Sequence, residues 1–278
     1  MAINLASKFE KKTSELLKAR RKTESVVNND FSWDGVNAIN VYTLTDPTMG
    51  SYDPNGGSAR YGNPTEVEDT IQTWTLSRDR AWTKTIDKLN YQDTQEVRKA
   101  GKYLAQATKN VLVPEMDTYI IQTIVTAGEV ANRDDIATDA ATTASNAYTD
   151  FTLITADISN QEAPEDGRVA LMTPSYYNFL KSSGFVLDSD SAYKDRKSGD
   201  YGSVDGCKVV IVPSSRMPAN TNLVITHPMV TVAPEKLVDY TLHDNPPGVS
   251  GQLLEYRHRY DAFVDTNKTG CIGIHKTA

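Results

Sequence analysis

The fold is decided by TIQTWTLSRDRAWTKTID, the stretch that occupies residues 70–87. Its side chains alternate with a period of two and are rich in Thr, Trp and Ile, which predicts a β-strand. Charges interrupt one face and threonines fill the other, so neither face is apolar enough for an ordinary core. At about 3.3 Å per residue, the strand would reach roughly 60 Å. A strand this long and polar needs a surface outside its own small domain.

A second alternating segment precedes this stretch, at residues 36–45. The two are separated by a segment at 46–64 that is rich in Gly and Pro, the residues of turns and loops. A strand, a long loop and a longer strand together predict one extended hairpin over residues 36–87.

The period changes after the strand, which predicts a long helix over residues 94–127. Asp93 and Glu96 fit a capping box at its start, and Gly128 can end it. Such a helix would span about 50 Å. Pro114 lacks an amide donor and clashes with the carbonyl four residues earlier, which predicts a kink or a break.

The rest of the chain mixes separate helices and strands, which predicts an α+β fold. Helices are expected at 151–160, with Leu153, Ile154 and Ile158 inward, and at 175–181. Strands are expected at 168–173, 207–212, 222–226, 229–233, 252–264 and 270–276. The last two of these strands are predicted to pair as a terminal hairpin.

Composition limits the class of protein. The chain has 278 residues, so one large domain or two modest ones is expected. A net charge of -7 argues against gripping nucleic acid as the main activity, although it is compatible with a container for nucleic acid. No apolar run approaches the roughly 20 residues of a membrane helix, and we expect no signal peptide. Cys207 and Cys271 are interpreted as reduced thiols, with a disulfide or metal pair as the alternative.

No motif predicts a catalytic, cofactor-binding or metal site. The four histidines lack the spacing of a helical metal pair, and phosphate-loop, dinucleotide and nucleophile-elbow motifs are absent. Asp188 and Asp190 begin like a calcium loop but lack its Gly and Glu, so they indicate a surface loop or a weak cation site. Catalytic residues that meet only in space leave an enzyme as an alternative.

Two basic segments are ambiguous. Residues 1–30 carry seven Lys and Arg against four acids, which indicates a solvated helix or an arm on a neighbouring subunit or partner. Further on, strand alternation places Arg257 and Arg259 on one face and Tyr256, His258 and Tyr260 on the other. Pairing of the arginines with acids is the expectation, and a ligand site is the alternative.

Local stretches in a particular order resemble one family. They are TWTLSRDRAWTKTIDKLNYQDT at 73–94, VLVPEMDTYIIQTIV at 111–125, GRVALMTPSYYNFLK at 167–181 and VDGCKVVIVPSSRMP at 204–218. Together they resemble the major capsid protein of tailed bacteriophages, with the Hong Kong 97-type shell fold. The resemblance covers nearly the whole chain, and none of these stretches is an invariant signature.

The resemblance implies five parts. They are an N-terminal arm at 1–33, an extended β-hairpin loop at 34–90, the spine helix of a peripheral domain at 91–130, an axial domain at 131–240, and C-terminal strands at 241–278 that return to the peripheral domain. The extended loop would lie on an adjacent subunit. The expected loop contacts are Arg60, Tyr61, Trp74, Leu76, Arg78, Arg80 and Trp82. The expected spine-helix break is Pro114, Glu115 and Asp117.

The implied function is assembly without catalysis. The subunit would form pentamers and hexamers of an icosahedral shell, joined non-covalently, that encloses double-stranded phage DNA without sequence-specific binding. Scaffolding, portal and other virion proteins are the further expected partners, and the virion and the host cytoplasm are the expected locations. The alternatives are an encapsulin-like nanocompartment shell, a soluble α+β enzyme, and a minor virion protein such as a decoration or connector subunit.

Overall fold

The structure is a computed structural model that describes residues 21–28, 38–55, 60–63, 66–89, 100–134, 141–183 and 202–277. The chain divides into two compact units. We call Asp30–Ser77 the hairpin unit, and Met1–Asn29 together with Arg78–Ala278 the main unit. The expected capping box at Asp93 and Glu96, the Asp188–Asp190 loop and most of the basic N-terminal segment lie outside the described residues.

The hairpin unit contains two antiparallel strands, β1 (Ala38–Leu44) and β2 (Asp69–Thr75). Tyr42 lies directly opposite Ile71, and Ile39 lies directly opposite Trp74. Because successive side chains point to opposite faces, these two cross-strand pairs lie on different faces of the hairpin. The predicted pairing of the segment at 36–45 with the start of the stretch at 70–87 is therefore confirmed.

The second half of that stretch belongs to another sheet. Strand β3 (Asp79–Asp87) pairs with β10 (Gly251–Tyr260), which pairs with β9 (Glu235–Asp244), all antiparallel. The prediction of one strand over 70–87 was wrong because the chain leaves strand conformation between Thr75 and Asp79 and changes sheets there. β3 is supported by its own chain and does not need an outside surface.

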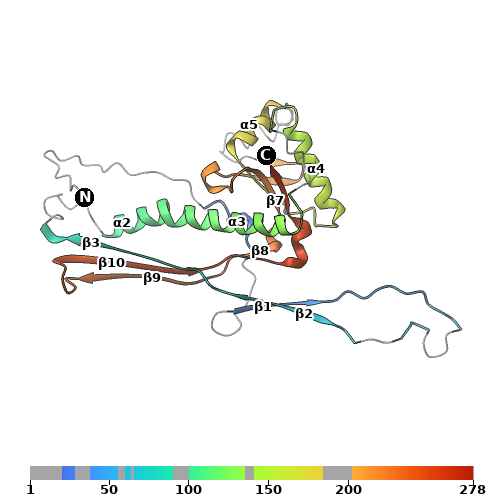
Figure 1. Ribbon diagram of the computed structural model, residues 1–278, viewed down its shortest axis with the longest axis horizontal. Helices are drawn as coiled ribbons and strands as arrows, with labels where there is room; N and C mark the ends of the chain where they lie inside the picture. The colour runs from blue at the N-terminus through green and yellow to red at the C-terminus, as the bar shows by residue number, and fades with distance from the viewer. Residues whose placement is uncertain are drawn as a thin grey trace. The chain divides into compact units, whose positions relative to one another are not determined.

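A continuous helical segment accompanies this sheet in the main unit. It consists of α2 (Ala100–Ala107), a π-helical turn η3 (Thr108–Leu112) and α3 (Val113–Val130), shown end to end in Figure 1. Pro114 does not break it, so the predicted break was wrong, while the kink given as the other outcome stays a prediction. The π turn directly upstream widens the backbone where proline supplies no amide donor, and both Leu112 and Val113 keep helical dihedral angles.

Gly128 lies inside α3 and does not end it, because the helix continues to Val130. A Cβ atom at Gly128 would collide with the Ile274 side chain. Glycine is therefore needed for close approach between α3 and the C-terminal strand, and the helix stops two residues later.

The main unit also contains a five-stranded sheet with the strand order β12-β7-β4-β6-β5. Its strands are β4 (Val169–Met172), β5 (Ser203–Val204), β6 (Cys207–Ile211), β7 (Thr221–Thr226) and β12 (Gly273–Lys276). Side chains of β4 alternate between two cores. Val169 and Leu171 join the core around α3, whereas Ala170 and Met172 join the core around α4 (Ala147–Asn160) and α5 (Pro174–Ser182). The sheet therefore lies between α3 and the α4–α5 pair.

The helices expected at 151–160 and 175–181 are present, and so are the strands expected at 168–173, 207–212 and 222–226. The strand expected at 229–233 was only partly right, because residues 228–230 form the 3-10 turn η6 and the strand β8 is limited to Thr231–Val232. Leu153 is exposed, however, and Phe151 takes the expected inward position with Ile154 and Ile158. The predicted terminal hairpin was wrong. β12 pairs with β7, because the 3-10 turn η7 (Thr266–Cys271) carries the chain to the five-stranded sheet.

Short elements complete the main unit. The strands β8 (Thr231–Val232) and β11 (Phe263–Val264) pair antiparallel, and Asn28 adds a parallel bridge to Val232. Among the described residues, the other 3-10 turns are η1 (Glu24–Val26), η5 (Ser214–Arg216) and η6 (Pro228–Val230).

Candidate functional site

The helix-facing side of the β3-β10-β9 sheet is aromatic. Trp82 of β3 stacks on Tyr256 of β10, with ring centroids 5.6 Å apart, and its edge meets Tyr103 of α2 at 5.8 Å. Register explains the stack, because Trp82 and Tyr256 are directly opposite each other. Trp82 therefore joins the sheet to the helical segment within one chain, whereas the sequence had placed it on the extended loop.

The carboxylate of Glu115, on the first turn of α3, gathers three partners. Arg78 Nη2 lies 2.9 Å from Oε1, Arg80 Nε lies 2.7 Å from it, and the Tyr260 hydroxyl donates to it at 3.2 Å. The Arg78 guanidinium also lies over the Tyr119 ring, 4.2 Å from its centroid. Burial works against ionisation of Glu115, but the hydrogen bonds from the two arginines outweigh it and hold its pKa below the ordinary value.

The carboxylate of Asp117, two residues further on, is fully buried. It accepts hydrogen bonds from the Lys22 amide at 3.0 Å and from the Thr23 hydroxyl at 2.8 Å, and it forms an ion pair with Arg216 at 2.6 Å. A buried carboxylate is tolerated when its lone pairs are satisfied in this way. Asp117 therefore joins the N-terminal segment, α3 and the η5 turn.

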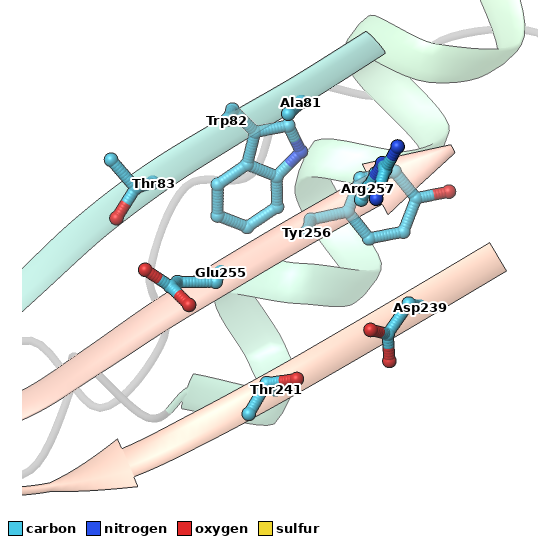
Figure 2. A pocket seen from close by; sticks show the side chains of 8 residues that line it. All are labelled: Ala81, Trp82, Thr83, Asp239, Thr241, Glu255, Tyr256 and Arg257. Carbon is cyan, nitrogen blue, oxygen red and sulfur yellow. The ribbon is translucent and has the colours of Figure 1, made fainter. Parts of the chain in front are cut away.

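The opposite side of the three-stranded sheet is charged and exposed. Arg257 donates three hydrogen bonds to the Asp79 carboxylate, the shortest from Nη2 at 2.6 Å. The register places Ala81, Arg257 and Asp239 in one row across the strands, and Figure 2 shows these side chains around a shallow hollow in the sheet surface. The predicted pairing of Arg257 with an acid is confirmed. The predicted alternation is also confirmed, because Tyr256 and His258 are buried while Arg257 is exposed.

The hairpin unit presents apolar side chains to solvent. Tyr42 is 63% exposed, its cross-strand partner Ile71 is 55% exposed, and Leu44 is 67% exposed on the same face. A two-stranded hairpin is at best marginally stable alone, and here three large apolar side chains share one exposed face of it. This face was not named from the sequence, although the alternation of Tyr42 and Leu44 carried the signal.

The expected loop contacts have different locations. In the hairpin unit, Arg60 is exposed, Tyr61 is 93% exposed and packs edge-on against Tyr52, Trp74 is half-buried, and Leu76 is buried. Arg78, Arg80 and Trp82 do not lie on the hairpin and instead contact α2 or α3 of their own chain. Their expected place on the loop was wrong because β3 belongs to the main unit.

The expected helix break has another role in the structure. Pro114 lies inside continuous helix, and Glu115 and Asp117 are the acids that bind distant parts of the main unit. Sequence reasoning missed their partners Thr23, Arg216 and Tyr260. A buried aspartate inside an apolar stripe was the available signal, since such a group requires donors from elsewhere.

The described residues offer neither a metal site nor a membrane-spanning helix. Within those ranges, no group of three or more His, Cys, Asp or Glu side chains is arranged to hold a metal ion. No helix in the described part of the chain is long and apolar enough to cross a membrane. Cys207 and Cys271 are free thiols, and burial raises the pKa of Cys207 to about 11.

Solved structures share this architecture over nearly its full length. A chain of Mycobacterium phage Che8 matches with a TM-score of 0.75 and 17% identity, covering 97% of this chain and 96% of that one. A chain in the mature capsid of bacteriophage PhiM1 matches with a TM-score of 0.73 and 14% identity, covering 98% and 92%. The chain has the fold of a phage capsid subunit. A chain of the cyanophage P-SCSP1u capsid also matches, with a TM-score of 0.71 and 12% identity over 97% and 93% of the two chains.

Sequence comparison adds no closer assignment. No family model matches the chain, and no curated protein matches it. At 10–17% identity the shared property is the fold, a mixed α+β architecture with a long helix.

Proposed function

We propose that this chain is the major capsid protein of a tailed bacteriophage, a subunit that assembles into an icosahedral shell around double-stranded DNA. The fold match carries the proposal, because it covers nearly all of this chain and nearly all of each matched chain. It therefore leaves no large part of this chain for another activity. The resemblance of the local stretches to the Hong Kong 97-type family points the same way. The proposed subunit acts by assembly through surface contacts, and this assembly requires no cofactor.

The hairpin unit supplies the main proposed contact. Its exposed face of Tyr42, Leu44 and Ile71 is too small to form a core with itself, so a neighbouring subunit covers it. Arg60 and Tyr61, near the tip, would add contacts of the kind that arginine and tyrosine favour at interfaces. Leu76 is already buried and leaves this set, while Trp74 stays as a half-buried member.

The finer family parts extend the same proposal. The segment at 1–33 is the arm, the helical segment ending at Val130 is the spine of the peripheral domain, the α4–α5 module is the axial domain, and the C-terminal strands return to the spine. The change of sheets between Thr75 and Asp79 moves the proposed end of the extended loop from residue 90 to Ser77.

The net charge of the chain fits the proposed contents of the shell. With a net charge of -7 the wall repels DNA more than it binds it, which suits a container that must release its contents. Pentamers and hexamers of this chain are the proposed assembly units, and scaffolding and portal proteins are the proposed further partners.

Sedimentation velocity of the purified chain at high concentration tests this function. We expect particles of megadalton mass, and nuclease-protected nucleic acid in particles from infected cells. Particles that contain a protein cargo and no nucleic acid would favour a nanocompartment shell of the same fold. A stable monomer would contradict any shell and return an enzyme to consideration.

A matched pair of variants tests the hairpin contact. Tyr42→Ser combined with Ile71→Ser should raise the concentration needed for assembly about tenfold or more, since a lost 1.4 kcal/mol of contact energy is a factor of ten. The control combines Val130→Ser with Met229→Ser, which removes exposed apolar side chains of the main unit. Equal effects of the two variants would contradict the proposed contact.

A further inference from the structure

The chain crosses between the two units twice, and both crossings lie close to anchored residues of the main unit. It leaves the main unit after Asn29 and returns at Arg78. Arg78, at the return crossing, binds Glu115 on the first turn of α3. Lys22 and Thr23, seven and six residues before the outgoing crossing at Asn29, bind Asp117, two residues further along that helix. Neither the fold match nor the proposed function assigns this role to them.

The return crossing is held at its first residue. Arg78 forms an ion pair with Glu115 at 2.9 Å, and its Nε donates to the Tyr260 hydroxyl at 3.0 Å. Its carbonyl accepts from the Tyr260 amide at 3.2 Å, and its guanidinium lies over Tyr119. Arg80 adds a second ion pair to Glu115 at 2.7 Å. The chain is thus fixed in backbone and side chain directly where the hairpin unit ends.

The chain before the outgoing crossing is held at residues 22–28 by contacts with the main unit. Asp117 accepts from the backbone amides of Lys22 and Thr23 and from the Thr23 hydroxyl. The Asn28 amide donates to the Thr231 carbonyl at 2.8 Å, one residue before the unit ends. Arg216 neutralises Asp117, so the carboxylate can stay buried while it binds backbone amides.

The spacing of the two acids suits two separate anchors. Residues two apart on a helix are separated by about 200° around its axis, so Glu115 and Asp117 point to nearly opposite sides. Each carboxylate therefore serves one crossing without competing for the partners of the other. Both are carried by the same rigid turn of helix, next to the π turn that accommodates Pro114.

We propose that Glu115 and Asp117 are positioning residues that fix the two ends of the hairpin unit to the long helix, and so set how the hairpin meets a second copy of this chain. The proposal rests on the proposed shell function. A loop whose two ends are held loses less freedom when it docks, because part of the ordering has already taken place. The acids act through Arg78 and Thr23 and need not touch the neighbouring subunit.

Two conservative variants separate positioning from general stability. Glu115→Gln keeps size and an acceptor oxygen but loses the charge, and Asp157→Asn is its control. Asp157 is also a helix carboxylate paired with an arginine, Arg133, and its side chain is 30% exposed against 26% for Glu115. Thr23→Val removes one donor to Asp117 without stranding Arg216. Its control is Thr155→Val, a buried threonine far from both crossings in sequence.

Assembly concentration and urea midpoint are measured for all four variants and the parent. We expect Glu115→Gln and Thr23→Val to raise the concentration for half-assembly about tenfold or more, and the controls to change it about twofold or less. Equal shifts in all four, tracking their urea midpoints, would overturn the inference and reduce the two acids to structural groups. If the parent never assembles, the proposed function itself is contradicted. If the parent assembles and Glu115→Gln and Thr23→Val assemble at the same concentration, only this inference is contradicted.

Discussion

Trp82 lies directly opposite Tyr256 in the β3–β10 register, with their ring planes only 19° apart. This stack fastens β3, an edge strand of its three-stranded sheet, to the strand beside it. The edge contact of Trp82 with Tyr103 then joins the sheet to α2. The stability of the main unit therefore depends on a residue of the stretch at 70–87, which was expected to need a surface outside its own domain.

Trp82→Ala should lower the free energy of unfolding of the main unit by about 2 kcal/mol, the sum of lost apolar burial and a lost aromatic pair. Urea denaturation followed by circular dichroism measures it. Trp74→Ala, in the hairpin unit, is the control and should leave the main transition in place. The prediction is wrong if the two variants shift that transition equally.

Gly128→Ala should destabilise the chain by about 1–3 kcal/mol, because its new methyl group meets Ile274 where α3 approaches β12. Gly101→Ala is the matched control on the same helical segment, with no atom within 4 Å of the added carbon. It should stabilise by about 0.5–1 kcal/mol through helix propensity. Thermal unfolding of both variants checks the pair, and the same sign for both would refute the packing explanation.

Arg216→Ala should cost about 3–5 kcal/mol, because it leaves the buried Asp117 carboxylate without its cation. Arg257→Ala removes an equally short ion pair, with Asp79, from the exposed sheet face. Water and salt screen that pair, so its loss should barely move the urea midpoint. Comparable losses in the two variants would show that burial does not decide the strength of these pairs.

The pKa of Glu115 predicts an acid-dependent contribution to stability. Because the folded-state value lies below the ordinary 4.5, the ionised carboxylate stabilises the fold above that pH. The contribution is lost as the pH falls through the lowered folded-state value. The urea midpoint of Glu115→Gln should thus lie below that of the parent near neutral pH, and the gap should close in acid. A gap that stays constant with pH would contradict this assignment.

Local periodicity predicted much of the fold. Four predicted elements are present: the strand at 36–45, the helix at 151–160, the buried strand at 168–173 and the proline-opened helix at 175–181. Each of them depends on residues that are neighbours in sequence. Leu153 faces solvent because the α4 core takes Phe151 in its place.

Long-range pairing explains what the sequence did not predict. Alternation runs through Ser77 without a break, so nothing local marks the change of sheets between β2 and β3. The partner of β3 is β10, far along the chain, and that of β12 is β7. The predicted break at Pro114 is absent because a π turn upstream can accommodate a proline inside a helix.

Long-range partners also explain why the roles of Glu115 and Asp117 were not predicted. Glu115 and Asp117 were noticed only as part of a helix break, since their partners Arg78 and Thr23 lie far away in sequence. The exposed face of the hairpin follows from the register of Tyr42 and Ile71, which was settled only when the two strands were paired.

An electron micrograph of the purified chain at high concentration tests the central claim most directly. The shell proposal predicts closed particles of uniform diameter with five-fold vertices, built from many copies of the 30.6 kDa chain. A field without particles, from protein that sediments as a single 30.6 kDa species, would contradict it.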